Sequence, residues 1–105
     1  MHTFLPRLGE TWSVFYVNNQ QPVINNRRAP EHGCLVEVHT PECERVRLIA
    51  SGTVGQSVEG EVVDIRWVRG DEIAVEQCHV QRIAIGSRLT CDLSSVMSVT
   101  WPNQF

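Results

Sequence analysis

Apolar residues along most of this chain occur in short runs that suit β-strands. In TWSVFYV, residues 11–17, aromatic and β-branched side chains fill both alternating sets of positions, which predicts a strand covered on both faces. Turn-forming residues bound each run, and no run has a convincing helical period. Further strands are predicted at 34–40, 45–50, 61–68, 72–85, 88–93 and 95–101.

This series of short strands and closely spaced turns predicts an all-β fold of six or seven strands. We expect a small, strongly bent antiparallel barrel or sandwich, in the size range of SH3-like, Sm-like or OB barrels. For the last run, a short helix or 3₁₀ turn capped by Ser94 is the alternative to a strand. The length of 105 residues suits a single domain, 1–105.

Three segments are predicted to lie between or beyond the strands. The polar stretch 18–33 is rich in Asn, Gln, Pro and Gly and predicts a long loop, which a short strand at 22–25 would shorten. The Gly- and Ser-rich residues 51–60 predict another connection. The tail 102–105 is expected to be mobile, or to dock on a partner together with Trp101.

The tripeptide Arg-Gly-Asp at 69–71 is interpreted as the turn of a hairpin and not as an adhesive ligand. With a three-residue loop, Trp67 lies opposite Ile73 and Arg66 lies opposite Ala74. This register gathers apolar side chains on one face, whereas a shift by one residue mixes the two faces. The central glycine supplies the backbone freedom that a tight loop needs. An adhesive role would also require export, for which no signal is visible.

The same register places two carboxylates, Asp64 and Glu76, opposite each other. Paired carboxylates can divide the roles of acid and base between them. Arg66 and Arg82 are expected to lie nearby, so a solvated charge cluster is the favoured interpretation.

The composition favours an ordinary globular domain. The hydrophobic fraction is 42%, the formal charge is −3, and no apolar run reaches the roughly 20 residues of a membrane span. We therefore expect neither a disordered chain nor a membrane protein. The lack of a basic and then apolar leader predicts a cytoplasmic location with four free thiols. There are nine arginines and no lysines, but a net acidic domain has no bulk attraction for nucleic acid.

Four potential zinc ligands, His32, Cys34, His39 and Cys43, lie within EHGCLVEVHTPEC. Their number suits a tetrahedral site, and the pattern is similar to a zinc knuckle with altered gaps. Alternation along the intervening strand, however, directs Cys34 and His39 to opposite faces. We therefore favour a buried Cys34, an exposed Cys43 and two surface histidines, with no metal or other cofactor.

The favoured function is a non-catalytic binding or assembly module that self-associates or binds a protein partner. Small open barrels expose strand edges, which invite partner strands. The contact residues are expected to be Arg27 and Arg28 in the long loop, with Trp12 and Trp101 as exposed aromatic residues.

Two alternatives stay open. The first is a barrel that binds single-stranded nucleic acid through Arg45 and Arg47 together with the two loop arginines. The second is a small enzyme with a site between subunits, in which His39 or His79 acts as acid or base and Cys78 lies nearby. Cys78 and His79 are strand neighbours and point to opposite faces, so a core cysteine beside a surface histidine is favoured over a thiolate–imidazole pair.

Overall fold

The computed structural model describes residues 2–9, 12–16, 19–26 and 29–102, and its regular structure is almost entirely β. This confirms the all-β class. The one helical segment in this part of the chain is a single 3₁₀ turn, so no described helix has the length and apolar character to cross a membrane. The elements are β1 (Trp12–Tyr16), β2 (Asn19–Asn26), β3 (Leu35–His39), β4 (Glu44–Val54), β5 (Ser57–Trp67), β6 (Ile73–Ala74), β7 (Arg88–Asp92), η1 (Leu93–Ser95) and β8 (Ser98–Trp101).

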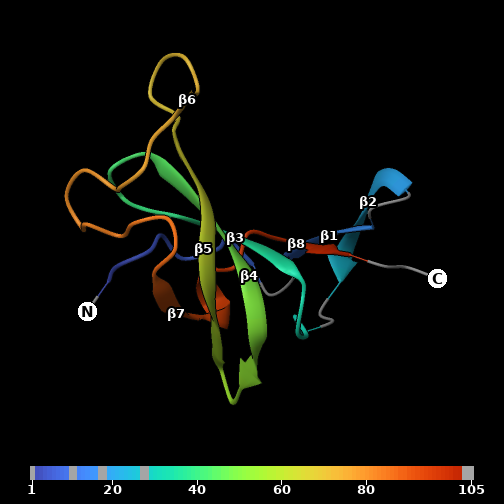
Figure 1. Cartoon of the computed structure of the whole chain (residues 1–105). Coiled ribbons are helices and arrows are strands. Elements are labelled where there is room, and N and C mark those ends of the chain that lie inside the picture. The colour runs from blue at the N-terminus through green and yellow to red at the C-terminus, as the bar shows by residue number, and fades with distance from the viewer. Residues whose placement is uncertain (1, 10–11, 17–18, 27–28, 103–105) are drawn as a thin grey trace.

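All eight strands belong to one sheet, in the order β2-β1-β8-β3-β4-β5-β6, with β7 paired to β5 beside β6. Figure 1 shows the long strands β4 and β5 at the centre, with β1 and β2 projecting to one side. The end strands β2 and β6 do not pair with each other, so the sheet is not closed into a barrel within the described residues. The sheet is also mixed, because β1 runs parallel to β8 while the other pairs are antiparallel.

Alternating side chains divide the sheet into a buried inner face and a partly exposed outer face. In β3 the second and fourth residues are buried, and β7 follows the same pattern. Burial of these mainly β-branched side chains is the main stabilising term for the sheet. The inner core includes Val14, Cys34, Val36, Val38, Val46, Leu48, Val58, Val62, Ile65, Cys78, Ile83, Leu89, Cys91, Val96 and Val99.

The β4–β5 hairpin is longer than the sequence pattern predicts. Residues 51–60, expected to be a connection, instead extend both strands to a turn at Gly55 and Gln56. The hairpin contains a bulge: Leu48 pairs with Val62 and Arg47 pairs with Asp64, which leaves Val63 without an opposite residue. The bulge buries Val62 and exposes Val63, because the side-chain alternation restarts on its far side.

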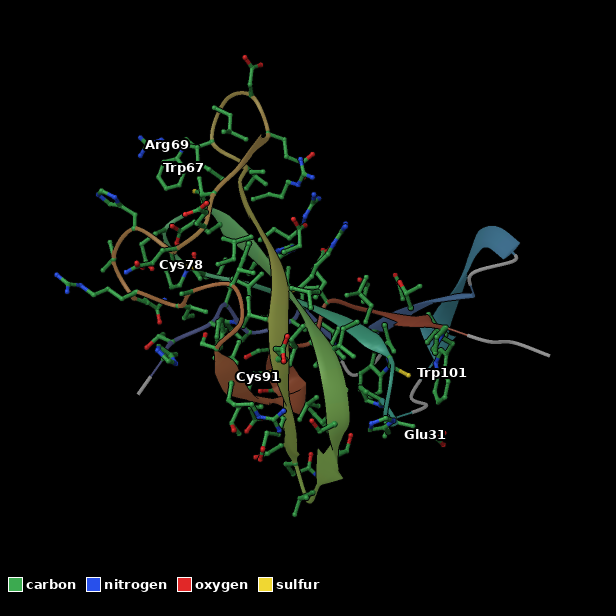
Figure 2. The ribbon with its side chains drawn as sticks, in the orientation of Figure 1. Glu31, Trp67, Arg69, Cys78, Cys91 and Trp101 are labelled. Carbon is green, nitrogen blue, oxygen red and sulfur yellow. The ribbon has the colours of Figure 1, made fainter. Side chains whose placement is uncertain are left out.

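The Arg-Gly-Asp segment is the hairpin turn that the sequence predicts, at the tip where Figure 2 labels Arg69. Trp67 pairs with Ile73 and Arg66 pairs with Ala74, which confirms the predicted register. The φ angle of the central glycine is +87°, a conformation that favours glycine.

The strand predicted at 72–85 is wrong beyond β6. Val75 still donates to the Ile65 carbonyl at 3.0 Å, but the chain then leaves the sheet in a loop closed by an isolated bridge between Gln77 and Ala84. The lower part of the β5 edge is taken by Ser87 and β7 instead. For the same reason the predicted Asp64–Glu76 pair does not form.

Three smaller predictions have mixed outcomes. The polar stretch 18–33 contains β2, which is longer than the short strand expected at 22–25 and pairs with β1. Residues 95–101 contain the end of the 3₁₀ turn as well as β8, and the cap of that turn is Asp92, which accepts from the Ser94 backbone N–H at 2.9 Å. In the tail, residues 103–105 lie outside the described residues.

Candidate functional site

A row of polar side chains crosses the outer face of the sheet. Each member lies opposite the next on the neighbouring strand: Ser13 on β1, Ser98 on β8, Glu37 on β3, Arg47 on β4 and Asp64 on β5. Cross-strand partners on one face stand close enough for direct contact. The row therefore brings together residues from both ends and the middle of the sequence.

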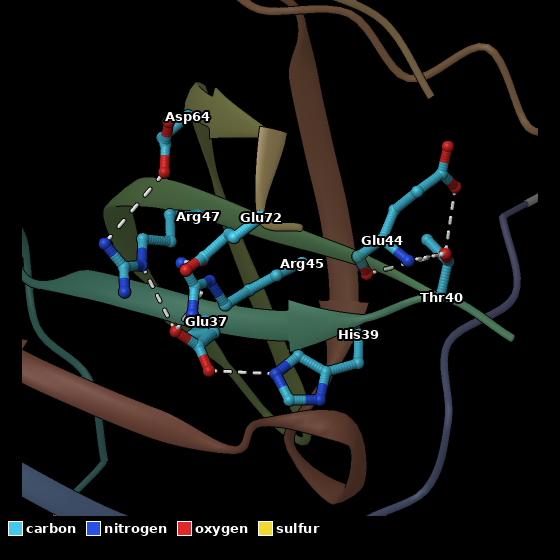
Figure 3. A network of polar contacts seen from close by, with 8 residues as sticks. All are labelled: Glu37, His39, Thr40, Glu44, Arg45, Arg47, Asp64 and Glu72. Atoms are coloured by element: carbon cyan, nitrogen blue, oxygen red, sulfur yellow. Dashed lines mark hydrogen bonds and ion pairs between the residues drawn. The ribbon is translucent and has the colours of Figure 1, made fainter. Parts of the chain in front are cut away.

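Glu37 is the centre of this row (Figure 3). Its carboxylate accepts from His39 Nε2 at 2.8 Å and from Arg47 Nε at 3.1 Å, and Arg45 Nε lies 3.7 Å away. Only 16% of the side chain is exposed. Burial alone would raise the pKa of Glu37, but the hydrogen bonds and charges of His39 and Arg47 outweigh burial and hold the pKa below its ordinary value.

The arginines around Glu37 are matched by further carboxylates. Arg45 pairs with Glu72, and Asp64 lies 3.5 Å from Arg66 Nε and 3.9 Å from Arg47. Three arginines thus face three carboxylates, and their charges nearly cancel. A strip of this kind offers little net attraction to a polyanion. The nucleic-acid alternative also needs Arg27 and Arg28, which lie outside the described residues, so it stays a prediction.

Next to this row the outer face is hollowed to a volume of about 420 Å³. Arg47 presents guanidinium N–H groups beyond the one bound to Glu37, and three hydroxyl groups stand beside it. Ligand sites commonly combine a few fixed polar groups with an apolar wall. This hollow is lined by Ser13, Leu35, Glu37, Arg47, Met97, Ser98 and Thr100.

Protonation of Glu37 predicts a loss of stability in acid. Because the native pKa lies below the unfolded one, the carboxylate stabilises the fold at pH values above about 4.5, and this contribution disappears as the pH falls through the native pKa. Glu37→Gln should lower the free energy of unfolding at pH 7 by about 1–3 kcal/mol and should flatten its decline in acid. Urea unfolding from pH 7 to about pH 3 measures both effects.

Glu61→Gln is the matched control, because Glu61 is exposed on β5. We expect that variant to follow the wild-type pH profile. Parallel profiles for wild type and Glu37→Gln would show that the Glu37 contacts do not stabilise the native state.

A second pocket, of about 300 Å³, is built around a buried carboxylate. Glu44 is only 1% exposed. It accepts from Thr40 Oγ1 at 3.0 Å and from the His79 backbone N–H at 2.5 Å. The contacts tie the loop after β6 to the turn between β3 and β4, and the edge of the Trp67 ring packs against the His79 ring. The main role of Glu44 is therefore structural.

The Cys78–His79 pair lacks the features of a nucleophile and its base. Cys78 is buried, and burial together with the nearby Glu44 carboxylate raises the pKa of its thiol to about 12. A thiol with this pKa is not a thiolate at neutral pH. His79 is exposed, so the two side chains point apart. His39, the other histidine of the enzyme hypothesis, is hydrogen-bonded to Glu37.

The four potential zinc ligands do not converge. Cys34 points into the core, while His39 lies on the outer face with Glu37, as strand alternation requires. Cys43 and His32 are both exposed. Among the described residues, no group of three or more His, Cys, Asp or Glu side chains is arranged to hold a metal ion.

Of the predicted contact residues, the two tryptophans are not exposed. Trp12 is 7% and Trp101 is 6% exposed, and the Arg7 guanidinium stacks over the Trp12 ring at 4.8 Å. The expectation of an exposed aromatic shelf was wrong, because both residues lie on the inner face of their strands. Arg27 and Arg28 lie outside the described residues.

Comparison with protein-family models, with curated proteins and with solved structures found no match for this chain. The site is therefore defined by its geometry alone. Sequence reasoning missed the hollow, because its walls come from residues far apart in the sequence: 13, 35, 37, 47, 97, 98 and 100. The one local signal was the alternation of polar residues with buried valines in β3, which marks Glu37 as outward-facing without naming its neighbours.

Proposed function

We propose that this chain is a non-catalytic binding module whose recognition site is the hollow on the outer face. The ligand class is a carboxylate with an apolar tail. Its charged oxygens would meet Arg47 and the neighbouring hydroxyl groups, and its tail would rest on Leu35 and Met97. Arg47 is suited to this role because forked N–H donors match the two oxygens of a carboxylate.

The observation that carries the proposal is the position of Arg47 between Glu37 and the hollow. Glu37 accepts from Nε at 3.1 Å and thereby fixes the guanidinium against β3. A side chain that is already ordered loses less entropy when a ligand binds. Glu37 itself is occupied by His39 and Arg47, which reduces its repulsion of an incoming anion.

The proposal is tested by titrating ¹⁵N-labelled protein with hexanoate and recording amide chemical shifts. We expect saturable shifts centred on 35–37, 47 and 97–100, with weaker or no shifts when inorganic phosphate replaces hexanoate. Arg47→Gln should reduce the affinity about tenfold, the size expected for loss of a charge-assisted contact. Arg69→Gln is the matched control, because Arg69 is exposed at the hairpin tip (Figure 2).

Shifts that are absent, or that are the same in Arg47→Gln, would overturn the proposed site. If phosphate binds as tightly as hexanoate, Arg47 contributes to binding but the apolar wall does not, and the proposed ligand class is wrong. A circular dichroism melt of each variant separates loss of binding from loss of folding.

A cytoplasmic location stays a prediction. It is supported by the state of the four cysteines, which are all free thiols, three buried and one exposed. Free thiols persist in a reducing compartment.

A further inference from the structure

Among the described residues, strand β7 has a pairing partner on one edge and none on the other. Its paired edge faces β5. Leu93 donates to Gln56 and Val62 donates to Ser87 at the two ends of this ladder. Because hydrogen-bonded and non-hydrogen-bonded pairs alternate in an antiparallel ladder, Leu89 and Cys91 direct their backbone groups to β5.

The other residues of β7 alternate with Leu89 and Cys91 and direct their backbone N–H and C=O groups away from β5. These residues are Arg88, Thr90 and Asp92. No other described strand pairs with β7. The Asp92 carbonyl is occupied, because Asp92 caps η1 and its carbonyl accepts the first bond of that turn. The open edge therefore offers both backbone groups of Arg88 and of Thr90 and the N–H of Asp92. All three side chains are exposed. A row of unpaired backbone groups of this kind is a template for another strand.

The surface is hollowed beside β7. A hollow of about 630 Å³ lies between β7 and the N-terminal segment, and Figure 2 labels Cys91 at the centre of the strand. Apart from β7 itself, its walls are contributed by short side chains and two rings. The lining residues are His2, Phe4, Ser57, Thr90, Cys91, Asp92 and Ser95.

We propose that a second copy of this chain pairs with the open edge of β7, antiparallel and about a two-fold axis through Thr90. In this arrangement Thr90 faces Thr90 of the second copy, and Arg88 faces Asp92 of the second copy at each end. The symmetry repeats the contact, as an isologous interface requires. The central Thr90 pair exchanges two backbone hydrogen bonds, and each Arg88–Asp92 pair adds one from the Asp92 N–H, about four in all.

Charge complementarity selects this arrangement over its alternatives. A parallel pairing would put Arg88 beside Arg88 and Asp92 beside Asp92. An axis through residue 88 or 92 would also place like charges opposite each other, which is destabilising. Only the axis through Thr90 makes both end contacts attractive.

The hydrogen bonds that Arg88 and Asp92 make within the chain leave both side chains able to pair with a second copy. Arg88 NH2 contacts Glu59 at 2.7 Å and Ser51 Oγ at 2.9 Å, which leaves its other N–H donors for a partner. Asp92 is exposed and uses Oδ1 for the Ser94 N–H, which leaves Oδ2 as a second acceptor. Hydrogen bonding from Ser94 lowers the pKa of Asp92, so the carboxylate is charged at neutral pH.

The test is a charge-reversal pair measured by sedimentation velocity. Wild type is expected to dimerise, and the fraction of dimer should rise with protein concentration. In Arg88→Asp both end contacts become acid against acid, and in Asp92→Arg both become base against base. Each variant alone should associate at least tenfold more weakly. An equimolar mixture of the two should form a heterodimer, because every end contact is again attractive.

Formation of the heterodimer also shows that both variants are folded. Thr90→Pro provides a second test, because the Thr90 N–H points away from β5 and its loss spares the native ladder while blocking the partner strand. Thr90→Ala is its matched control and should dimerise. A wild type that stays monomeric at high concentration, variants that still self-associate, or a mixture that fails to associate would each overturn the proposal. Arg47→Gln should dimerise normally, which separates this edge from the hollow.

Discussion

Gly60→Ala is expected to destabilise the fold by about 3 kcal/mol or more. A β-carbon at residue 60 would lie 2.2 Å from the Ile49 carbonyl oxygen and 2.9 Å from Leu48 Cδ1. The first of these atoms is backbone, in the strand paired with residue 60, so it cannot rotate away. Relief requires β4 and β5 to separate at the centre of the sheet, where Gly60 pairs with Ala50 on one side and Leu89 on the other.

Urea unfolding followed by tryptophan fluorescence measures this loss. Gly52→Ala is the matched control on the neighbouring strand, because a β-carbon there meets no atom within 4 Å. That variant should stay within about 0.5 kcal/mol of wild type or gain slightly from the reduced entropy of its unfolded chain. Equal stabilities of the two variants would mean that the strands are not as close at residue 60 as the structure places them.

Glu44→Ala is expected to lower the free energy of unfolding by about 2–4 kcal/mol. The substitution removes the acceptor of both the Thr40 hydroxyl and the His79 N–H, and it leaves these two donors and a cavity behind. Groups buried without a partner are costly. The loop after β6 should loosen as well, because the carboxylate is one of its contacts with the β3–β4 turn.

Hydrogen exchange at residues 76–85 and urea unfolding together measure this effect. The matched control is Glu42→Ala, two residues away, whose carboxylate receives a contact from Gln81 at 2.9 Å on a less buried surface. Glu42→Ala should lower the free energy of unfolding by less than about 1 kcal/mol. A double-mutant cycle with Thr40→Val isolates the Thr40–Glu44 contact. Unchanged exchange in the loop of Glu44→Ala would contradict the role assigned to Glu44.

The strand pattern of the sequence was sufficient to predict the fold class and the hairpin at residue 70. Alternation over two flanking strands predicted the pairing of Trp67 with Ile73, because that register gathers most of the apolar side chains on one face. It could not place the bulge at Val63. Two successive valines look the same whether the ladder is regular or bulged, and the choice depends on Arg47 and Leu48 in the partner strand.

Sequence reasoning also failed where neighbours compete for one edge. Residues 76–85 have enough apolar character for a strand, but β7 occupies the part of β5 that they would need. The site depends on similar long-range choices. Ser13, Ser98 and Arg47 meet only because β8 inserts between β1 and β3, and no local spacing contains that information. The buried tryptophans were misjudged for the same reason.

The parallel pairing of β1 with β8 joins the first strand to the last. Residues 13–16 align with residues 98–101, so the ladder closes a loop of more than eighty residues. Strand β3 also has β8 as one of its two neighbours, so its pairing is complete only when β8 is in place. Contacts this distant in sequence slow folding. On a ribosome, β1 and β2 emerge long before β8 is made. The β4–β5 hairpin can form before β8 is made, whereas the hollow is assembled only after β8 has left the ribosome.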